Sequence, residues 1–496
     1  MSRRSPLPKI PSLLALCGLA LLALLVPASP ARAAGMTTHA WMADVGIDAV
    51  EDQELRELLD AQRMTVLSGA SYPDSGYYAG AAYPAADFGE VSHWGRFIDA
   101  YVAHIRGKPE CEGTLTEPDG PCAALVAHLM GSAAHGMGDE TWDWMFESQM
   151  PDHGEHPHDR NRVDDQPGWA ELGTAPGGPD LQAELLDLDD RTIGDDHHPV
   201  FGVVNSPEYN MDVAAINVYG RTLFDSLPPP ASDLESVYRE IGRDDITADG
   251  IIAAWAGITG VLAAERASVA DAEGVRRDMP WSVANMTTSQ GGVEHSGAMI
   301  AGYYESLWAK LTGDGPPPLE VVGTAPFDGS AEVPTDWAGA QTFAGPHGDG
   351  DKRIIAVINN GLDPETDRYL PDAMRLLDSD GNEVTPRPGF PFTGPYGGDG
   401  VHSIAFFPAA DLDPCETYTA EVTTALADHA GTSLAEPYRW SFTTRSADGS
   451  ACPEPPDPTE CVPPGRSGGK GKAGDRGPCG EHGADGSPLT GRSRIG

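Results

Sequence analysis

The chain has 496 residues and a formal net charge of −43, with 75 acidic against 32 basic side chains. Nucleic acids and anionic bilayers are usually bound through basic patches, so this composition argues against proteins of those classes. The surplus of carboxylates attracts divalent cations, although it is equally typical of acidic exported proteins whose surface charge serves solubility alone.

Residues 1–34 are predicted to be an export signal. Arg3, Arg4 and Lys9 form a basic start, an apolar stretch follows over residues 13–26, and Ala31-Arg-Ala33 supplies a small-x-small cleavage pattern. The apolar stretch is short for a membrane span, and no later segment is apolar for long enough to cross a bilayer. We therefore expect a secreted, soluble mature protein.

Removal of this segment leaves six cysteines, an even number that suits an oxidising compartment. Six cysteines allow fifteen connectivities. Pairing of neighbours along the chain predicts the disulfides Cys111–Cys122, Cys415–Cys452 and Cys461–Cys479.

Helical periodicity dominates residues 35–315. Apolar residues recur at helical spacing over residues 50–67, 97–105, 123–146, 234–241, 247–266 and 295–311. Thr247 begins a capping pattern, and Asp233 is expected to cap the helix that follows it. Residues 152–207 have no clear period and are acidic with Gly and Pro, which predicts a surface-loop insertion.

After residue 318 the pattern changes to short alternating segments. Residues 353–358, 402–407, 417–422 and 438–444 are predicted strands, with turn residues such as Asp378-Ser-Asp-Gly381 between them. Residues 319–446 are therefore expected to form a β-sandwich. Residues 447–496 are rich in Pro and then in Gly, which predicts a disordered tail.

The predicted sandwich resembles the bacterial Ig-like domains found beside secreted enzymes. The resemblance rests on its start, Pro326-Phe-Asp-Gly-Ser-Ala-Glu-Val-Pro334, and on its end, Trp440-Ser-Phe-Thr-Thr444. It implies an all-β Ig-like sandwich that acts as a spacer or binds a cell surface.

The predicted helix over residues 123–146 is mostly apolar, yet it contains His135, Asp139 and Asp143. These lie at i, i+4 and i+8, so an α-helix would place them on one face. Burying carboxylates without partners is costly, and a bound cation removes that cost. The spacing favours a zinc site, and a polar network in a helical core is the alternative.

Other stretches contain further zinc-binding side chains, which are imidazoles and carboxylates. In chain order the motifs are His39, Pro73-Asp-Ser-Gly76, Ser92-His-Trp-Gly-Arg-Phe97 and Gly131-Ser-Ala-Ala-His-Gly-Met-Gly-Asp-Glu-Thr-Trp142. This order resembles the zinc-dependent phospholipase C family, in particular the amino-terminal domain of glycosylphosphatidylinositol-specific phospholipase D. The resemblance covers about residues 36–313 and is strongest over residues 37–143.

The resemblance implies a mostly α-helical zinc phospholipase C-like domain over residues 35–315, with up to three zinc ions. Asp74, His93, His135 and Asp139 match the first zinc site, and Asp74 also matches the catalytic residue that orients or deprotonates water. His39 matches a ligand of a further zinc ion that shares Asp139.

The remaining zinc site departs from the family pattern. Asp143 stands where the family has a histidine four residues after the shared aspartate. Glu208 is the candidate acid of a downstream pair, but Val204 occupies the position of its histidine. His197 or His198 in the insertion can supply the missing ligand, and the alternative is that they are ordinary loop histidines.

The implied reaction is hydrolysis of a phosphodiester by attack of zinc-activated water on phosphorus. The substrate would be a phospholipid or a glycosylphosphatidylinositol-type lipid, reached through transient contact with a membrane surface. A zinc-dependent single-strand nuclease of the same superfamily is the enzymatic alternative, but the acidic charge disfavours it and no nucleic-acid partner is expected. A non-catalytic secreted protein that binds metal or a surface is the alternative from another class.

Overall fold

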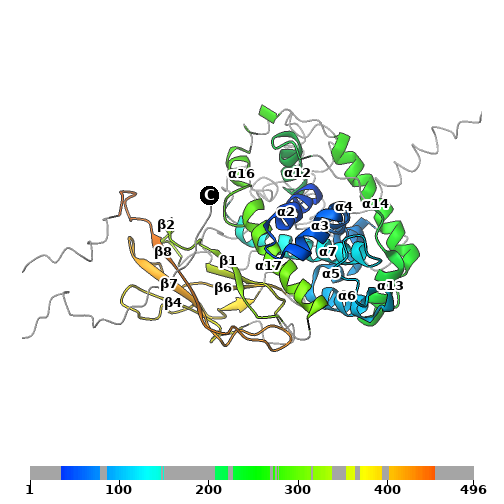
Figure 1. The fold of residues 1–496 in the computed structure, drawn as a ribbon. Coiled ribbons are helices and arrows are strands. Elements are labelled where there is room, and N and C mark those ends of the chain that lie inside the picture. The colour runs from blue at the N-terminus through cyan, green and yellow to red at the C-terminus, as the bar shows by residue number, and fades with distance from the viewer. Residues whose placement is uncertain are drawn as a thin grey trace, which may run out of the picture. The chain divides into compact units, whose positions relative to one another are not determined.

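The computed structural model consists of helices followed by two β-sheets (Figure 1). It describes residues 35–78, 87–146, 207–221, 227–267, 279–313, 317–337, 354–362, 369–393 and 401–452, together with residues 149, 272, 273 and 276. The predicted export signal lies outside these ranges, and so do nearly all of the insertion and most of the predicted tail. So do four residues predicted to be ligands or disulfide partners, which are His197, His198, Cys461 and Cys479.

The helical part confirms the predicted helical character of the amino-terminal region. Its helices are α2 (Met36–Ala49), α3 (Gln53–Ala61), α4 (Arg63–Gly69), α5 (Asp87–His93), α6 (Gly95–Gly107), α7 (Ala123–Thr141), α12 (Pro207–Asn217), α13 (Ala231–Glu240), α14 (Ala248–Ala267), α16 (Pro280–Asn285) and α17 (Val293–Thr312). Two 3₁₀ segments, η1 (Pro73–Tyr78) and η3 (Pro109–Cys111), and one π-helical turn, η4 (Trp142–Phe146), complete the described part.

Local hydrogen bonds explain where several of these helices begin. The Asp52 carboxylate accepts a hydrogen bond from the backbone N–H of Leu55 at 2.9 Å and caps α3. The Thr247 hydroxyl accepts one from the N–H of Gly250 at 3.3 Å, as its capping pattern predicts. The single helix predicted over residues 50–67 is wrong, because Gln62 separates α3 from α4.

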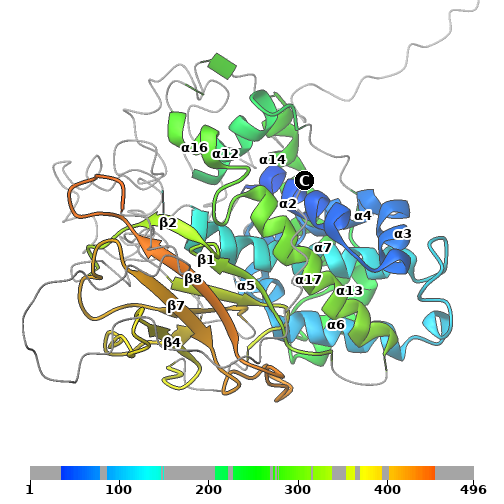
Figure 2. The same ribbon diagram turned by 60° about the vertical axis from the view of Figure 1, so that its left-hand side comes forward.

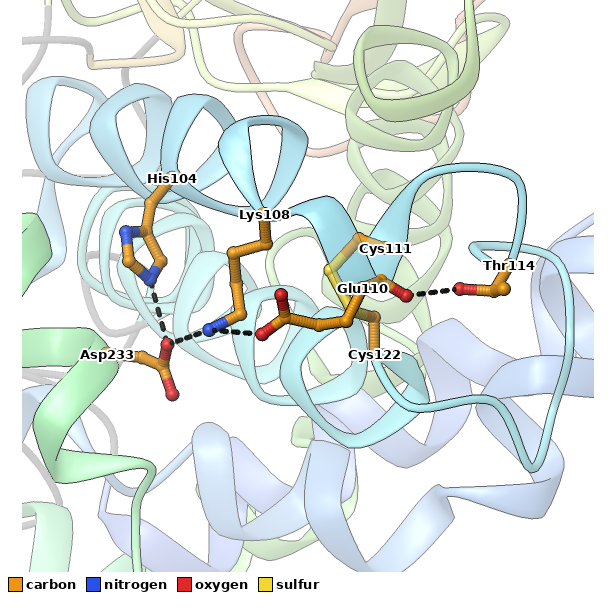
Figure 3. The surroundings of a disulfide bond; sticks show 7 residues. All are labelled: His104, Lys108, Glu110, Cys111, Thr114, Cys122 and Asp233. Carbon is orange, nitrogen blue, oxygen red and sulfur yellow. Dashed lines mark hydrogen bonds and ion pairs between the residues drawn. A yellow bond between two sulfur atoms is a disulfide. The ribbon is translucent and has the colours of Figure 1, made fainter.

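Asp233 does not cap α13 as predicted. The helix begins two residues earlier, and Asp233 lies in its first turn, where the helix dipole favours a carboxylate. Its Oδ1 atom lies 2.9 Å from His104 Nε2 and accepts a hydrogen bond from Lys108 Nζ at 2.7 Å (Figure 3). These contacts join α13 to α6. The disulfide Cys111–Cys122 is shown beside them and confirms that predicted pair.

The carboxyl-terminal part contains two four-stranded sheets. Their strands are β1 (Val321–Ala325), β2 (Ser330–Val333), β3 (Ile354–Ile358), β4 (Met374–Leu377), β5 (Phe392–Thr393), β6 (Ser403–Phe406), β7 (Thr417–Val422) and β8 (Tyr438–Thr444). The first sheet has the order β1-β3-β6-β5 and is antiparallel. The second has the order β2-β8-β7-β4, in which only β2 and β8 are parallel. The four predicted strands correspond to β3, β6, β7 and β8. Cys415 and Cys452 are both disulfide-bonded, as expected.

Strand β3 is buried on both faces. Ile354, Ala356 and Ile358 belong to the apolar core between the two sheets, whereas Ile355 and Val357 belong to the core of the helical part. Successive side chains of a strand point to opposite faces, so a strand that is apolar at every position has no face for solvent. The first sheet is therefore a layer between the helices and the second sheet (Figures 1 and 2). Helix α17 contacts β1 and β3. The described residues up to Gly449 belong to one compact unit.

An ion-pair cluster also joins the helices to the sandwich. The Asp99 carboxylate of α6 lies 2.6 Å from Nε2 of His429, which follows β7, and 2.8 Å from Nζ of Lys310 in α17. The hydrogen bond to Asp99 raises the pKa of His429 above its ordinary value of 6.5, although partial burial opposes this. Burial favours the neutral form of Asp99, but His429 and Lys310 outweigh it and lower the pKa of Asp99.

We expect His429→Ala to destabilise the protein more at about pH 6 than at about pH 8. The raised pKa of His429 means that its contribution is complete below pH 6.5 and is lost as the pH rises through its folded-state value. The lowered pKa of Asp99 keeps that carboxylate charged throughout this range. Urea unfolding of wild type and variant at both pH values measures the difference. Equal destabilisation at both would contradict the assigned ion pair.

Candidate metal centre

Five of the predicted ligands lie together in the core of the helical part. They are His39 from α2, Asp74 from η1, His93 from the last residue of α5, and His135 and Asp139 from α7. All five are buried, and none exposes more than 6% of its surface. They form two overlapping groups, in each of which the candidate ligand atoms lie within 4.8 Å of one another.

Two of the imidazoles face each other through the same nitrogen. The Nε2 atoms of His93 and His135 are 2.9 Å apart. The other ring nitrogens are held by backbone carbonyls, His93 Nδ1 by Gly89 O at 2.8 Å and His135 Nδ1 by Ala70 O at 2.6 Å. A carbonyl only accepts, so each Nδ1 carries a hydrogen and each Nε2 of the neutral ring presents a lone pair. Two lone pairs at this distance repel each other unless a cation or a proton lies between them.

Two carboxylates complete this position. Asp74 Oδ1 lies 3.5 Å from His93 Nε2 and 3.4 Å from His135 Nε2. Asp139 Oδ2 lies 3.3 Å and 3.6 Å from the same two atoms. Asp74 Oδ1 is buried and has no hydrogen-bond partner among the described residues. Two nitrogen and two oxygen atoms around one point form a donor set that suits zinc.

The second oxygen of Asp139 faces a different histidine. Asp139 Oδ1 lies 2.8 Å from His39 Nε2, yet within the described part neither atom has a hydrogen bond of suitable geometry. The His39 ring stacks on that of His135, with centroids 3.8 Å apart. A carboxylate that offers one oxygen to each of two neighbouring donor groups would contribute a ligand to both of them.

The ionisable side chains of this cluster shift one another's pKa values. Burial favours the neutral forms of Asp74 and Asp139, but the neighbouring His135 outweighs it and lowers the pKa of both, that of Asp139 to about 2. Burial disfavours a charged His93, but the adjacent carboxylates of Asp139 and Asp74 raise its pKa well above the ordinary value. Burial lowers the pKa of His135. These interactions therefore favour the charged forms of both carboxylates and of His93.

Glycines of α7 allow the neighbouring segments to approach the ligands. A Cβ on Gly131 would lie 2.0 Å from the backbone oxygen of Val66, so α4 can pack against α7 only at a glycine. This approach brings the Ala70 carbonyl to His135. A Cβ on Gly136 would lie 2.0 Å from the backbone oxygen of His93. The glycines of the motif thus admit the segments that position both imidazoles.

The structure leaves the remaining zinc site undescribed. Helical structure extends to Phe146 as predicted, but the α-helix ends at Thr141 and Asp143 lies in the π-helical turn η4. The regular i, i+4, i+8 register therefore does not extend to Asp143. Glu208 lies in the first turn of α12. The side chains of both residues, and the whole of His197 and His198, lie outside the described part of the chain.

The sequence-based prediction missed Asp212, a buried carboxylate next to the cluster. It accepts hydrogen bonds from the backbone N–H groups of Thr37 and Thr38, at 3.0 and 2.8 Å, and from the Thr38 hydroxyl at 2.7 Å. It thereby caps the helix that carries His39. Asp212 is 175 residues from Thr37, so no local pattern reveals the contact.

Glu140, which directly follows Asp139, was also missed. It accepts hydrogen bonds from the backbone N–H groups of His402 and Ser403, both at 2.8 Å, and from the Ser403 hydroxyl. Burial raises the pKa of Glu140 to about 7, although these hydrogen bonds lower it. Its partners are 262 and 263 residues away in the chain.

Comparisons with known proteins identify the carboxyl-terminal part. Residues 315–444 match the bacterial Ig-like domain family, which supports the predicted Ig-like sandwich. No curated protein matches the chain. None of the described helices is both long and apolar enough to cross a membrane.

The solved structures that match the chain include three of the bacterial surface layer protein SbsC. The N-terminal part of the bacterial S-layer protein SbsC is 11% identical, over 70% of this chain and 78% of that chain, with a TM-score of 0.18. Domains 1–6 of surface layer protein SbsC are 10% identical, over 70% of this chain and 45% of that chain, with the same TM-score. A TM-score this low does not show that the two proteins share a fold.

Proposed function

We propose that this protein is a secreted zinc-dependent phosphodiesterase that hydrolyses phospholipids. The observation that carries the proposal is the pair of opposed Nε2 atoms of His93 and His135, 2.9 Å apart and flanked by two carboxylates. The motif order that resembles the zinc-dependent phospholipase C family supplies the reaction class. Secretion is inferred from the predicted export signal.

The donor set fits zinc. Asp74, His93, His135 and Asp139 would hold one ion, and His39 with the other oxygen of Asp139 would contribute to a second. The backbone carbonyls on the Nδ1 atoms of both opposed imidazoles keep each Nε2 available as a ligand. Zinc in such a site supplies a Lewis acid for the phosphoryl group and makes water nucleophilic near neutral pH.

Asp74 is the residue we expect to orient the attacking water or to accept its proton. Its carboxylate is ionised because His135 and His93 lower its pKa despite burial. Its Oδ1 atom faces both imidazoles at 3.4 and 3.5 Å. The surrounding burial excludes bulk water and strengthens these charge interactions.

The net charge of −43 favours a lipid over a nucleic acid as the substrate. A single nucleic-acid strand is a polyanion and would be repelled along its length. A phospholipid with a zwitterionic head group presents one phosphodiester beside a cation. Binding of a cell surface by the Ig-like sandwich stays a prediction.

Protein purified without chelator is expected to contain at least about one zinc ion per chain. It is expected to cleave zwitterionic phospholipid vesicles, to lose this activity on dialysis against a chelator, and to regain it with added zinc. Metal analysis and chromatographic identification of the products measure both effects. A parallel assay with single-stranded DNA as the substrate distinguishes a phospholipase from the nuclease alternative. Protein without zinc would contradict both enzymatic functions.

A further inference from the structure

Two residues that directly follow candidate ligands contact the Ig-like sandwich. Glu140 follows Asp139, and its buried carboxylate receives three hydrogen bonds from His402 and Ser403 at the start of β6. Trp94 follows His93, exposes only 7% of its surface and belongs to the apolar core of the sandwich. The sandwich therefore contacts both ligand-bearing segments, α7 and α5, at the residues next to their ligands.

The last turn of α7 also contacts α17. The Thr141 hydroxyl lies 2.9 Å from the hydroxyl of Ser296 in that helix. The α-helix ends at Thr141 and continues as the π-helical turn η4. A helix end that changes its hydrogen-bond pattern needs outside contacts to keep one conformation. Glu140 and Thr141 supply these contacts one and two residues after Asp139.

We propose that Glu140 is a positioning residue through which the Ig-like sandwich holds Asp139 in place, so that the sandwich is part of the support of the metal centre. The proposal rests on the proposed zinc centre and deepens it. A carboxylate that accepts two backbone N–H groups and a hydroxyl has a defined orientation, and it transmits that orientation to the adjacent residue of the helix. Partners outside the ligand set typically set metal affinity in this way.

The test compares zinc affinity in three full-length variants by competition with a chromophoric chelator. Glu140→Gln places an amide N–H against the donors of β6 and is expected to weaken zinc binding about 10- to 100-fold. Ser403→Ala removes one of the three donors without altering the Glu140 side chain itself, so a smaller loss in the same direction is expected from the positioning role. His429→Ala removes a contact between sandwich and helices that involves neither a candidate ligand nor Glu140, and it is expected to lower stability with unchanged zinc affinity.

Circular dichroism establishes that each variant is folded before zinc is titrated. Wild-type zinc affinity in both Glu140→Gln and Ser403→Ala would overturn the positioning role and leave the zinc centre intact. Equal losses of affinity in all three variants would also overturn it, because a general loss of stability would then explain the result. Wild-type protein that binds no zinc would overturn the metal centre together with this role.

Discussion

Substitution of His135 by alanine is expected to abolish phosphodiesterase activity and to weaken zinc binding more than about 100-fold, beyond the effect typical of partners outside the ligand set. His135 Nε2 is the nitrogen that faces His93, Asp74 and Asp139 at once. Its removal leaves two buried carboxylates with one imidazole between them, which is too few donors for a tetrahedral zinc site. Metal analysis and lipid hydrolysis measure the two effects separately.

Two related variants separate the two candidate ions. Asp139→Ala is expected to lose both, because its oxygens face different histidines. His39→Ala is expected to retain the first ion, since His39 lies only on the Oδ1 side of Asp139. His104→Ala is the matched control, because this histidine pairs with Asp233 between two helices away from the ligands. Wild-type turnover in both His135→Ala and Asp139→Ala would refute the site.

Gly136→Ala is expected to destabilise the protein by about 1–3 kcal/mol, although alanine is the better helix former. The new Cβ would lie 2.0 Å from the backbone oxygen of His93, so α5 must move away from α7. That movement displaces the His93 imidazole, and zinc affinity is expected to fall together with stability. Urea unfolding with and without zinc measures both.

Gly260→Ala provides the matched control in α14. Apart from the adjoining backbone of α14 itself, no atom of the described residues lies within 4 Å of a Cβ at this position, so only helix propensity changes. We expect this substitution to stabilise the protein by up to about 1 kcal/mol, which is opposite in sign to the effect of Gly136→Ala. If both variants changed the free energy of unfolding in the same direction, close packing at Gly136 would not be what determines the effect of its substitution.

The amino-acid sequence by itself determined which segments form helices and which form strands, and many of the residues at which they begin and end. Helical periodicity and capping marked α14 and α17, and short apolar segments marked β3 and β6. The eleven-residue separation of Cys111 and Cys122 made their pairing predictable. The spacing of His135 and Asp139 placed both on one face of α7. These features depend on neighbouring residues, so periodicity and spacing record them.

Only the tertiary structure decided which distant residues meet. It showed that His39, Asp74 and His93 converge on α7, where the resemblance had supplied the set without any geometry. It replaced the predicted capping role of Asp233 with contacts to another helix, and it gave Glu140 its partners in β6. Such contacts join residues far apart in the chain and leave no periodic trace in the sequence. Their energy depends on burial and on approach distances that arise only when the helices and the first sheet pack together.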